Sequence, residues 1–379
     1  MQAVIIAAGK STRTYPLTEN RHKALLPLMN IPLLESTLNN LKTLPEINSV
    51  VIIVGHMKDE IMDHFALDFN GLKISYVFQN EQKGTGHALA LCENFIKDDE
   101  FICMYGDDLY SIKDIKKLVK IKNGALVKKV DDPSRFGVFV QEKMVAKDLV
   151  EKPKKFISDL ANIGVYKFTK DIFDYLKDVK KSPRGEIELT DAVFSLMKKE
   201  KFILKEVKDY WIPLAYPWDL LIAHDRFMKQ KKKDEIKGTI SKKAKIKGRL
   251  VLGTESIIED GVFISGNVSI GKGCVIGRGS KITDSIIMDG TKIGSDSEIK
   301  SSIIAENCVV SENVKMISEN KRGKIFSFVK GKKVDISRET FGCAVGDNVN
   351  IKSGAIIFPG VKISSGKTIK EKSRIKKDI

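Results

Sequence analysis

Residues 240–276 read ISKKAKIKGRLVLGTESIIEDGVFISGNVSIGKGCVI, and this stretch decides the architecture of the second part of the chain. An aliphatic residue occupies every sixth position, a period that fits neither an amphipathic helix nor a strand with alternating faces. Continued to residue 288, the series is Ile240, Ile246, Leu252, Ile258, Ile264, Ile270, Ile276, Ile282 and Met288. A six-residue period is typical of a parallel β-helix, whose aliphatic side chains stack from coil to coil, so we predict such a domain here.

The repeat changes phase once and is interrupted once further along the chain. After residue 288 the phase moves by one residue to Ile293 and Ile299, and the six-residue period returns at Val345. Between these stretches, residues 315–340 break the pattern with charged residues and glycines. We interpret them as a loop or extension that leaves the coils.

The first part of the chain follows a different pattern, in which short apolar runs alternate with stretches of helical spacing. The predicted strands are Ala3–Ala7, Val50–Val54, Ile74–Phe78, Phe101–Tyr105 and Ala125–Val130, and the predicted helices are Leu33–Leu44, Lys58–Phe65, His87–Ile96 and Ser111–Lys120. This alternation predicts parallel βαβ units and a sheet that is covered on both faces. Because ligands of such sheets gather at the carboxyl ends of the strands, we expect the chemistry just after each run.

A Lys-rich segment, KQKKKDEIK at residues 229–237, separates the two patterns. We therefore predict a first domain over residues 1–228, a connector over 229–238 and a repeat domain over 239–379. Basic residues concentrate after residue 230, where 30 of the 65 Lys and Arg stand against 17 of the 49 Asp and Glu. Few aromatic residues accompany them, so we interpret the charge as a solvated surface and expect no nucleic-acid partner.

The composition narrows the class of protein. The 379 residues are 42% hydrophobic and 30% charged, which is typical of a globular rather than a disordered chain. The five cysteines are scattered and form no CxxC pair, which argues against a disulfide framework or a zinc site. No apolar run approaches the ~18–20 residues of a membrane span. We expect a cytoplasmic protein without a membrane partner.

The segment after the first predicted strand carries small and basic residues. Residues 7–27 read AAGKSTRTYPLTENRHKALLP. Small residues let the backbone approach a ligand closely, and successive N–H groups can then form an anion-binding nest. The fixed positive charges of Arg13 and Lys23 suit phosphate groups. The segment therefore predicts a phosphate-binding loop, although it lacks the P-loop pattern.

This segment resembles the opening motif of the sugar-1-phosphate nucleotidylyltransferases, AAGxGTRxxPxTxxxPKxxxP. It departs from the motif at Ser11, where the family usually has Gly, and at His22, where it usually has Pro. The resemblance implies an α/β domain with a Rossmann-like mixed sheet, followed by a left-handed parallel β-helix of hexapeptide repeats. The catalytic residues that it implies are Arg13 and Lys23, and the nucleotide contacts are Ala8, Gly9, Ser11 and Thr12.

Residues 79–88 read QNEQKGTGHA and look like QxxQxGTGHA, the base-binding motif of the uridylyltransferase members. Uncharged amide and backbone groups can read the imide edge of uracil or thymine. The further nucleotide contacts implied are Gln79, Gln82, Gly84 and Thr85. We do not assign His87 as a catalytic base, because it follows a Gly-rich turn and is expected to pack or to begin a helix.

A carboxylate, Asp107, follows a hydrophobic strand, and the resemblance assigns it as a magnesium ligand. Mg²⁺ prefers carboxylate and phosphate oxygens, so we expect it as the cofactor. Relatives often carry W-x-D-x-G later in the domain, and its Asp supplies a second ligand. Here Pro213 occupies that position and cannot coordinate through its side chain. Asp219, six residues further on, either substitutes as a ligand or begins the following helix.

Three later stretches look like the sugar-side motifs of the family: FGV at residues 136–138, VEKP at 150–153 and NIGVY at 162–166. The sugar-phosphate contacts that they imply are Gly137, Glu151, Lys152 and Asn162. Residues 184–191, RGEIELTD, resemble an acidic segment that borders the same pocket. The order of these motifs along the chain supports the resemblance more than any one of them does.

The implied reaction is attack by a sugar-1-phosphate oxygen on the α-phosphorus of a nucleoside triphosphate, with release of pyrophosphate. Alignment and charge neutralisation carry such a reaction, because the attacking oxygen is already anionic. We predict transfer of UMP or dTMP from the NTP to glucose-1-phosphate or N-acetylglucosamine-1-phosphate. The partners are therefore the NTP and the sugar-1-phosphate.

Two other functions stay open. Certain subunits of the eukaryotic translation-initiation exchange factor resemble this architecture and bind protein partners, so a non-catalytic nucleotide-binding regulatory or assembly subunit is one alternative. In bifunctional relatives the β-helix is an acetyltransferase with a histidine base, but here no histidine follows His224, which disfavours acetyl transfer. We expect the β-helix to assemble the chain into a homo-oligomer, a trimer or larger.

Overall fold

The computed structural model describes residues 1–321 and 323–379. These residues form two compact units: the first comprises Met1–Lys10 and Leu33–Pro213, and the second comprises Ser11–Pro32 and Leu214–Ile379. The domain boundaries proposed from the sequence stay a prediction. Within the described ranges, no helix has the length and apolar character needed to cross a membrane.

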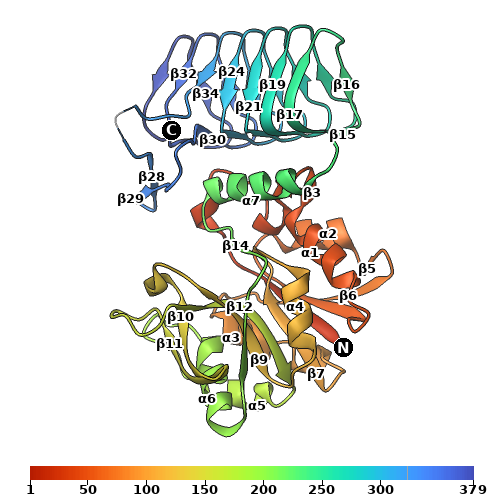
Figure 1. The fold of residues 1–379 in the computed structure, drawn as a ribbon, viewed down its shortest axis with the longest axis vertical. Helices are drawn as coiled ribbons and strands as arrows, with labels where there is room; N and C mark the ends of the chain where they lie inside the picture. Colours follow the sequence, from red (N-terminus) through yellow and green to blue (C-terminus); the bar gives the residue numbers. More distant parts are fainter. Residues whose placement is uncertain (322) are drawn as a thin grey trace. The chain divides into compact units, whose positions relative to one another are not determined.

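A mixed sheet forms the centre of the first unit (Figure 1). In spatial order its strands are β10 (Gly137–Glu142), β11 (Val145–Glu151), β13 (Ile203–Glu206), β9 (Gly124–Lys129), β12 (Leu160–Thr169), β7 (Glu100–Tyr105), β1 (Gln2–Ala7), β4 (Ser49–Val54), β6 (Leu72–Phe78) and β5 (Asp68–Phe69). The strands β7, β1, β4 and β6 run parallel to their neighbours within this group, whereas β12 is antiparallel to both β7 and β9. The mixed sheet expected from the family resemblance is thereby confirmed.

Apolar runs explain which strands lie at the centre of the sheet. Nearly every residue of β1 and β4 is buried, as is typical of parallel strands that are covered on both faces. The helices of this unit are α1 (Leu33–Lys42), α2 (Lys58–Phe65), α3 (Thr85–Ala90), α4 (Ile112–Val119), α5 (Ile172–Lys177) and α6 (Leu189–Lys199). The helix predicted over His87–Ile96 is shorter than expected, because α3 ends at Ala90 and a separate 3₁₀ turn follows at Glu93–Phe95.

The second unit contains a left-handed parallel β-helix, whose short strands pair in parallel from one coil to the next (Figure 1). Strands β17 (Lys245–Leu252) and β19 (Phe263–Ile270) place Ile246 beside Ile264, a step of three six-residue periods. The other coil strands are β15 (Glu235–Ile236), β16 (Thr239–Ile240), β18 (Ile257–Ile258), β20 (Val275–Ile276), β21 (Lys281–Thr283), β22 (Ile286–Ile287), β23 (Lys292–Ile293), β24 (Glu298–Lys300), β25 (Ile303–Ile304), β26 (Val309–Val310), β27 (Lys315–Met316), β30 (Cys343–Val345), β31 (Asn350–Ile351), β32 (Ile356–Ile357), β33 (Val361–Ile363), β34 (Thr368–Ile369) and β35 (Arg374–Ile375). The stacked aliphatic columns form a continuous core, as the six-residue period predicted.

The predicted change of phase is confirmed, but it begins earlier than expected. Ile270 pairs with Ile287 rather than with Met288, because one residue is missing from the turn near Asp284. Met288 is therefore buried outside the column, and its place in the predicted series is wrong. Sequence alone could not locate the change, since Ile287 and Met288 are both apolar.

The interruption of the coils begins later than predicted. Met316 still lies in a coil at the end of β27, whereas the sequence pattern broke at residue 315. The chain then forms a hairpin of β28 (Phe326–Val329) and β29 (Lys332–Asp335) and returns where the Phe341 N–H donates to Ser318 O at 2.9 Å. The coils continue across the excursion, because β25 pairs directly with β30.

Helix α7 (Pro217–Gln230) and the short strands β2 (Pro27–Leu28) and β3 (Ile31–Pro32) complete the second unit. Pro217 stands in the first turn of α7, where its fixed φ favours the helix and no N–H is needed. On the same helix, Asp225 accepts a hydrogen bond from Asn267 at 3.4 Å and pairs with Arg338 at 3.1 Å. Helix α7 is therefore fixed to the coils by polar contacts.

Candidate active site

The carboxyl ends of the parallel strands lie in register at one edge of the sheet. Ala7, Val54 and Phe78, the last residues of β1, β4 and β6, are register partners. The residues that follow them are Ala8, Gly55 and Gln79. This edge is where parallel sheets bind ligands, and two of these three residues were predicted from the sequence to contact the nucleotide.

Ala8 and Gly9 begin the predicted phosphate-binding loop at this edge. The Ala8 carbonyl accepts hydrogen bonds from Gln82 Nε2 at 2.8 Å and from the His56 N–H at 3.4 Å. Gly9 is exposed, and a methyl group added to its Cα would meet no protein atom within 4 Å. A phosphate can therefore approach the backbone here closely, which is the property that the small residues predicted.

The base loop, residues 79–86, is braced by hydrogen bonds and by close packing of its backbone. Gln79 is buried, and its Nε2 donates to Gly84 O at 2.9 Å. Gly84 has φ +105°, and an added Cβ would lie 2.5 Å from Ile187 O, so no other residue fits. Thr85 Oγ1 accepts from the Leu189 N–H at 3.3 Å. The predicted base contacts thus belong to one loop that hydrogen bonds and close packing hold in place.

His87 stands in the first turn of α3, next to this loop. Its Nδ1 lies 3.1 Å from Gln79 Nε2, and burial lowers its pKa. These contacts agree with a packing role at the start of a helix.

Residues 11–32, which we call the signature loop, belong to the second unit. Ser11 has φ +49°, in the left-handed region that favours glycine, and this explains why the family usually has Gly there. The Thr14 and Thr18 hydroxyls both donate to Ser11 O, at 2.6 and 3.0 Å. His22 Nδ1 accepts from the Ala24 N–H at 3.1 Å, so the imidazole caps the turn that carries Lys23.

The predicted metal ligand, Asp107, lies half-buried in the turn between β7 and β8 (Asp108–Tyr110). The neighbouring Asp108 accepts a hydrogen bond from Trp211 Nε1 at 3.0 Å. Strand β14 (Trp211–Pro213) pairs with β8 and places Pro213 opposite Asp108. Pro213 therefore lies beside the aspartate turn, and its ring supplies no ligand there.

The second metal candidate, Asp219, caps the start of α7. Its Oδ2 accepts the backbone N–H groups of Ala215 at 2.8 Å and Tyr216 at 2.7 Å. Helix capping accounts for this carboxylate, and its role as a ligand stays a prediction, as does that of Asp107. Among the described residues, no group of three or more His, Cys, Asp or Glu side chains could hold a metal ion.

Among the predicted sugar contacts, Glu151 and Lys152 lie near Arg184, a residue to which the sequence analysis gave no role. Glu151 Oε1 lies 3.2 Å from Arg184 Nη2 and 3.7 Å from Lys152 Nζ. Arg184 also pairs with Glu188 at 2.7 Å. Burial raises the pKa of Glu151, and the two cations oppose that shift. The RGEIELTD segment was the signal for Arg184, although sequence alone gave it no role.

The other two predicted sugar contacts lie close by in the same sheet. Gly137 is the register partner of Glu151 across β10 and β11. Asn162 Nδ2 donates to the Tyr166 hydroxyl at 2.6 Å, and its Oδ1 accepts from the Gly164 N–H at 3.2 Å. All four sugar-side residues are therefore gathered in the first unit.

The predicted site residues are divided between the two units. The first unit holds Ala8, Gly9, Gln79, Gln82, Gly84, Thr85, Asp107, Gly137, Glu151, Lys152 and Asn162, and the second holds Ser11, Thr12, Arg13, Lys23 and Asp219. The peptide bond between Lys10 and Ser11 joins the two halves of the phosphate-binding segment.

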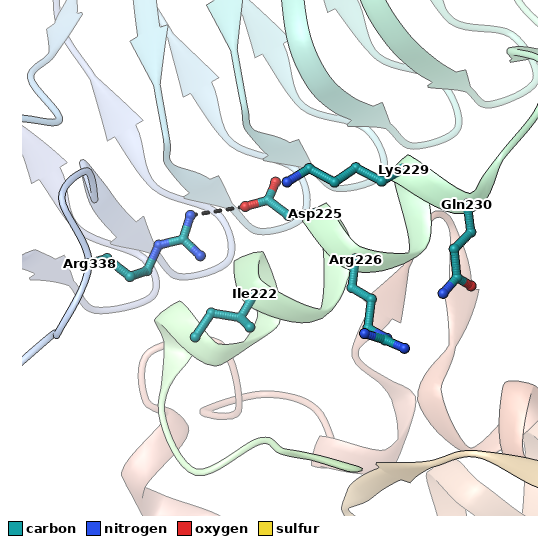
Figure 2. A pocket seen from close by; sticks show the side chains of 6 residues that line it. All are labelled: Ile222, Asp225, Arg226, Lys229, Gln230 and Arg338. Carbon is teal, nitrogen blue, oxygen red and sulfur yellow. Dashed lines mark hydrogen bonds and ion pairs between the residues drawn. The ribbon is translucent and has the colours of Figure 1, made fainter. Parts of the chain in front are cut away.

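The second unit also has an open pocket of about 480 Å³, lined by Ile222, Asp225, Arg226, Lys229, Gln230 and Arg338 (Figure 2). The Asp225–Arg338 ion pair lies at its wall. The motifs of the sequence assigned none of these residues to the nucleotide or the sugar. The pocket therefore lies outside the predicted site.

Comparison with known proteins identifies the family. The family model described as "Nucleotidyl transferase" matches residues 2–230. The chain belongs to this family. A second model, "GMPPB C-terminal domain", matches residues 240–342. The family drawn from residues 7–27 is thus confirmed, and with it the prediction of an enzyme that transfers nucleotidyl groups.

Named relatives match the chain over its whole length. "Bifunctional protein GlmU" of Methanococcus vannielii is 33% identical, with 100% of this chain and 96% of the relative covered. "Bifunctional sugar-1-phosphate nucleotidylyltransferase/acetyltransferase" of Sulfurisphaera tokodaii is 31% identical, with 100% and 98% covered. A solved structure of UDP-glucose pyrophosphorylase complexed with UDP-glucose has a TM-score of 0.55 and 26% identity, covering 61% of this chain and 99% of that one.

Proposed function

We propose that the protein transfers UMP or dTMP from UTP or dTTP to glucose-1-phosphate or N-acetylglucosamine-1-phosphate and releases pyrophosphate. The hydrogen bond from Gln82 to Ala8 carries this proposal, because it ties the base loop to the start of the phosphate-binding segment. One nucleotide can then meet uncharged base-reading groups and the open backbone at Gly9. A relative named for sugar-1-phosphate nucleotidylyl transfer supports the same reaction.

In this reaction a sugar-phosphate oxygen forms a bond to the α-phosphorus, and the bond from that phosphorus to the bridging oxygen of pyrophosphate breaks. No proton needs to move, because the attacking oxygen is already anionic and the bridging oxygen leaves as an anion of pyrophosphate. Arg13 and Lys23 neutralise the charge that builds up on the phosphates, and the loop amides orient them. Lys152 and Arg184 place cations beside Glu151, where the sugar phosphate is proposed to bind.

The residues present fit magnesium as an ion held largely by substrate. Mg²⁺ in such sites commonly takes one or two carboxylates and completes its shell with phosphates and water. Asp107 offers that carboxylate, and Pro213 excludes a second one at the usual position. When bound, the ion neutralises triphosphate charge.

The proposal is tested by pyrophosphate release with Mg²⁺, for UTP, dTTP, CTP, ATP and GTP against each of the two sugar-1-phosphates. We expect turnover with UTP or dTTP and a loss of about 100-fold or more in Asp107→Asn, as when a group that stabilises transition-state charge is removed. Asp63→Asn is the matched control, because Asp63 is exposed on α2 and the charge change is the same.

Preference for a purine nucleotide would contradict the base assignment. An unchanged rate in Asp107→Asn would contradict the metal assignment. If no substrate pair releases pyrophosphate although a nucleotide still binds, the alternative of a regulatory or assembly subunit would be favoured.

A second activity, acetyl transfer by the β-helix, is favoured by one observation. The relatives named as bifunctional match the chain throughout, coils included. Against it, the sequence has no histidine after His224 to act as a base. An assay of thiol release from acetyl-CoA in the presence of glucosamine-1-phosphate tests this activity. Thiol release would support acetyl transfer by the β-helix, and its absence would contradict it.

We also propose that the β-helix assembles the chain into a homo-oligomer. Ile257 and Val309 point outward from one coil face and are 46% and 44% exposed. Both lie in the sheet that contains β18 and β26, so a second copy could cover them together.

A further inference from the structure

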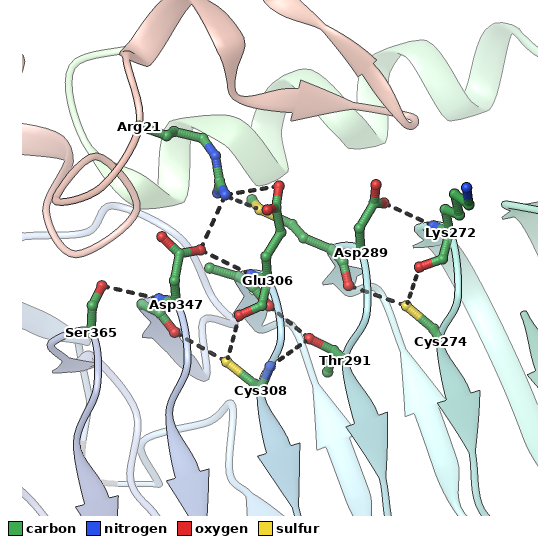
Figure 3. Close-up of polar contacts among 12 residues, drawn as sticks. Arg21, Lys272, Cys274, Asp289, Thr291, Glu306, Cys308, Asp347 and Ser365 are labelled. Atoms are coloured by element: carbon green, nitrogen blue, oxygen red, sulfur yellow. Dashed lines mark hydrogen bonds and ion pairs between the residues drawn. The ribbon is translucent and has the colours of Figure 1, made fainter. Parts of the chain in front are cut away.

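Arg21 lies in the signature loop, two residues before the proposed catalytic Lys23, and its side chain reaches the β-helix (Figure 3). Its Nη2 lies 2.8 Å from Glu306 Oε1 and 3.2 Å from Asp347 Oδ1. Its Nη1 lies 3.5 Å from Met288 Sδ, the methionine that the shortened coil displaces from its column. A single guanidinium thus contacts three coils.

The contact between Arg21 and Asp347 is shielded from water, and the coils fix the position of Asp347. The side chains of Arg21 and Asp347 are only 12% and 5% exposed, so their attraction is screened less than that of a surface pair. The coils hold the acids in place, because Asp347 Oδ1 also accepts the Glu306 N–H at 3.0 Å. Ser365 Oγ in turn accepts the Asp347 N–H at 3.0 Å.

Two more contacts fix the same loop to the coils on either side of Lys23. Glu19 Oε2 accepts the Ser365 N–H at 2.7 Å. Asn30 Nδ2 donates to Ile270 O at 2.7 Å. Both partners on the coils are backbone groups, whose positions are set by the β-helix ladder. The loop is therefore held before, beside and after its catalytic lysine.

We propose that Arg21 is a positioning residue, which uses the β-helix as a rigid template to hold Lys23 and Arg13 in the geometry needed for nucleotidyl transfer. The inference rests on the proposed function. It gives the coils a part in nucleotidyl transfer, in addition to assembly. Arg21 acts only through the loop and does not itself contact the substrate.

The experiment uses the full chain and compares Arg21→Met, Arg21→Lys and Glu306→Gln with wild type. Arg278→Met is the matched control, because Arg278 is exposed on the coils and its loss changes the net charge equally. We expect kcat to fall ~10- to 100-fold in Arg21→Met while the KM for the sugar phosphate changes little, since misplaced catalytic groups affect the transition state most. Arg21→Lys should recover part of the rate, and Arg278→Met should keep all of it.

Amide hydrogen exchange supplies a readout that does not depend on turnover. In Arg21→Met we expect faster exchange over residues 11–32 and unchanged exchange in the coils around Ile264 and Ile282, which excludes general unfolding. If Arg21→Met fails to fold, Glu306→Gln tests the same contact with a smaller change.

Unchanged exchange over residues 11–32 in both variants, or a wild-type kcat in Arg21→Met, would overturn the inference. Wild-type protein that turns over no substrate pair would instead overturn the proposed function, and the exchange data would still decide whether Arg21 holds the loop.

Discussion

The base loop in the first unit and the signature loop in the second unit are held by different forces. Gly84 in the base loop lies so close to Ile187 that no side chain fits, and Gln79 and Thr85 add neutral hydrogen bonds. The signature loop is fixed by charged side chains, above all by Arg21 between Glu306 and Asp347. An added side chain should therefore disrupt the base loop. A change of charge or protonation should weaken the second unit, which holds the signature loop.

The largest effect is expected at Gly84. Replacement by Ala places a Cβ 2.5 Å from Ile187 O at a φ of +105°, so it adds both a clash and backbone strain. Together these should cost about 3 kcal/mol of stability and abolish nucleotide binding. Urea unfolding and titration with UTP measure the two effects.

Gly185→Ala is the control for this prediction. Gly185 also has a positive φ, +80°, but an added Cβ would meet no atom within 4 Å. It should therefore show the strain alone, and equal losses in the two variants would mean that close packing does not hold the base loop.

An intermediate effect is expected from His224, which is fully buried on α7 and whose ring nitrogens form no hydrogen bond with any residue that the structure describes. Burial lowers its pKa from 6.5 to about 4. In the unfolded chain His224 binds a proton below about pH 6.5, whereas in the folded chain it does so only below about pH 4. The free energy of unfolding therefore falls as the pH falls through this window. The loss relative to His224→Leu should reach at most about 3 kcal/mol at pH 4.

Unfolding of wild type and His224→Leu between pH 7.5 and 4 measures this loss. Because α7 contacts β2 within the signature loop, we expect acid to weaken the second unit first. Parallel pH curves for wild type and His224→Leu would show that the burial of His224 carries no such cost.

The smallest effect is expected at Ser11. Its φ of +49° strains a serine, so Ser11→Gly should stabilise the second unit by about 0.5 kcal/mol once the greater freedom of glycine in the unfolded chain is counted. Thermal unfolding measures the gain. Ser364→Gly, at a residue outside the left-handed region, should instead destabilise, and the same sign for both would refute the strain at Ser11.

The architecture could be predicted from the sequence because buried apolar residues recur there at regular spacings. The coils follow from the six-residue period, and the sheet follows from alternating apolar runs. Where two neighbouring residues are both apolar, as Ile287 and Met288 are, the period cannot tell which one enters the column. The registers of the coils decide it.

For the candidate site, only residues that belong to local sequence motifs could be proposed from the sequence. The sequence predicted that Gln79 and Asp107 follow strands, and in the structure Gln79 directly follows β6 and Asp107 lies in the turn after β7. The motifs could not reveal that Ser11 has a positive φ, or that Arg21 pairs with acids far away in the sequence, because both depend on the folded backbone. The division of the phosphate-binding segment between two units was equally hidden.

The hairpin excursion makes the coil stack a modular scaffold. Because β25 pairs directly with β30, the coils bypass the intervening chain, which leaves near Ser318 and returns at Phe341. The length and sequence of the inserted piece are thereby freed from the strict periodicity that governs its surroundings. A protein engineer can therefore graft a reporter or binding peptide into the turn between β28 and β29, which leaves the Arg338–Asp225 ion pair in place.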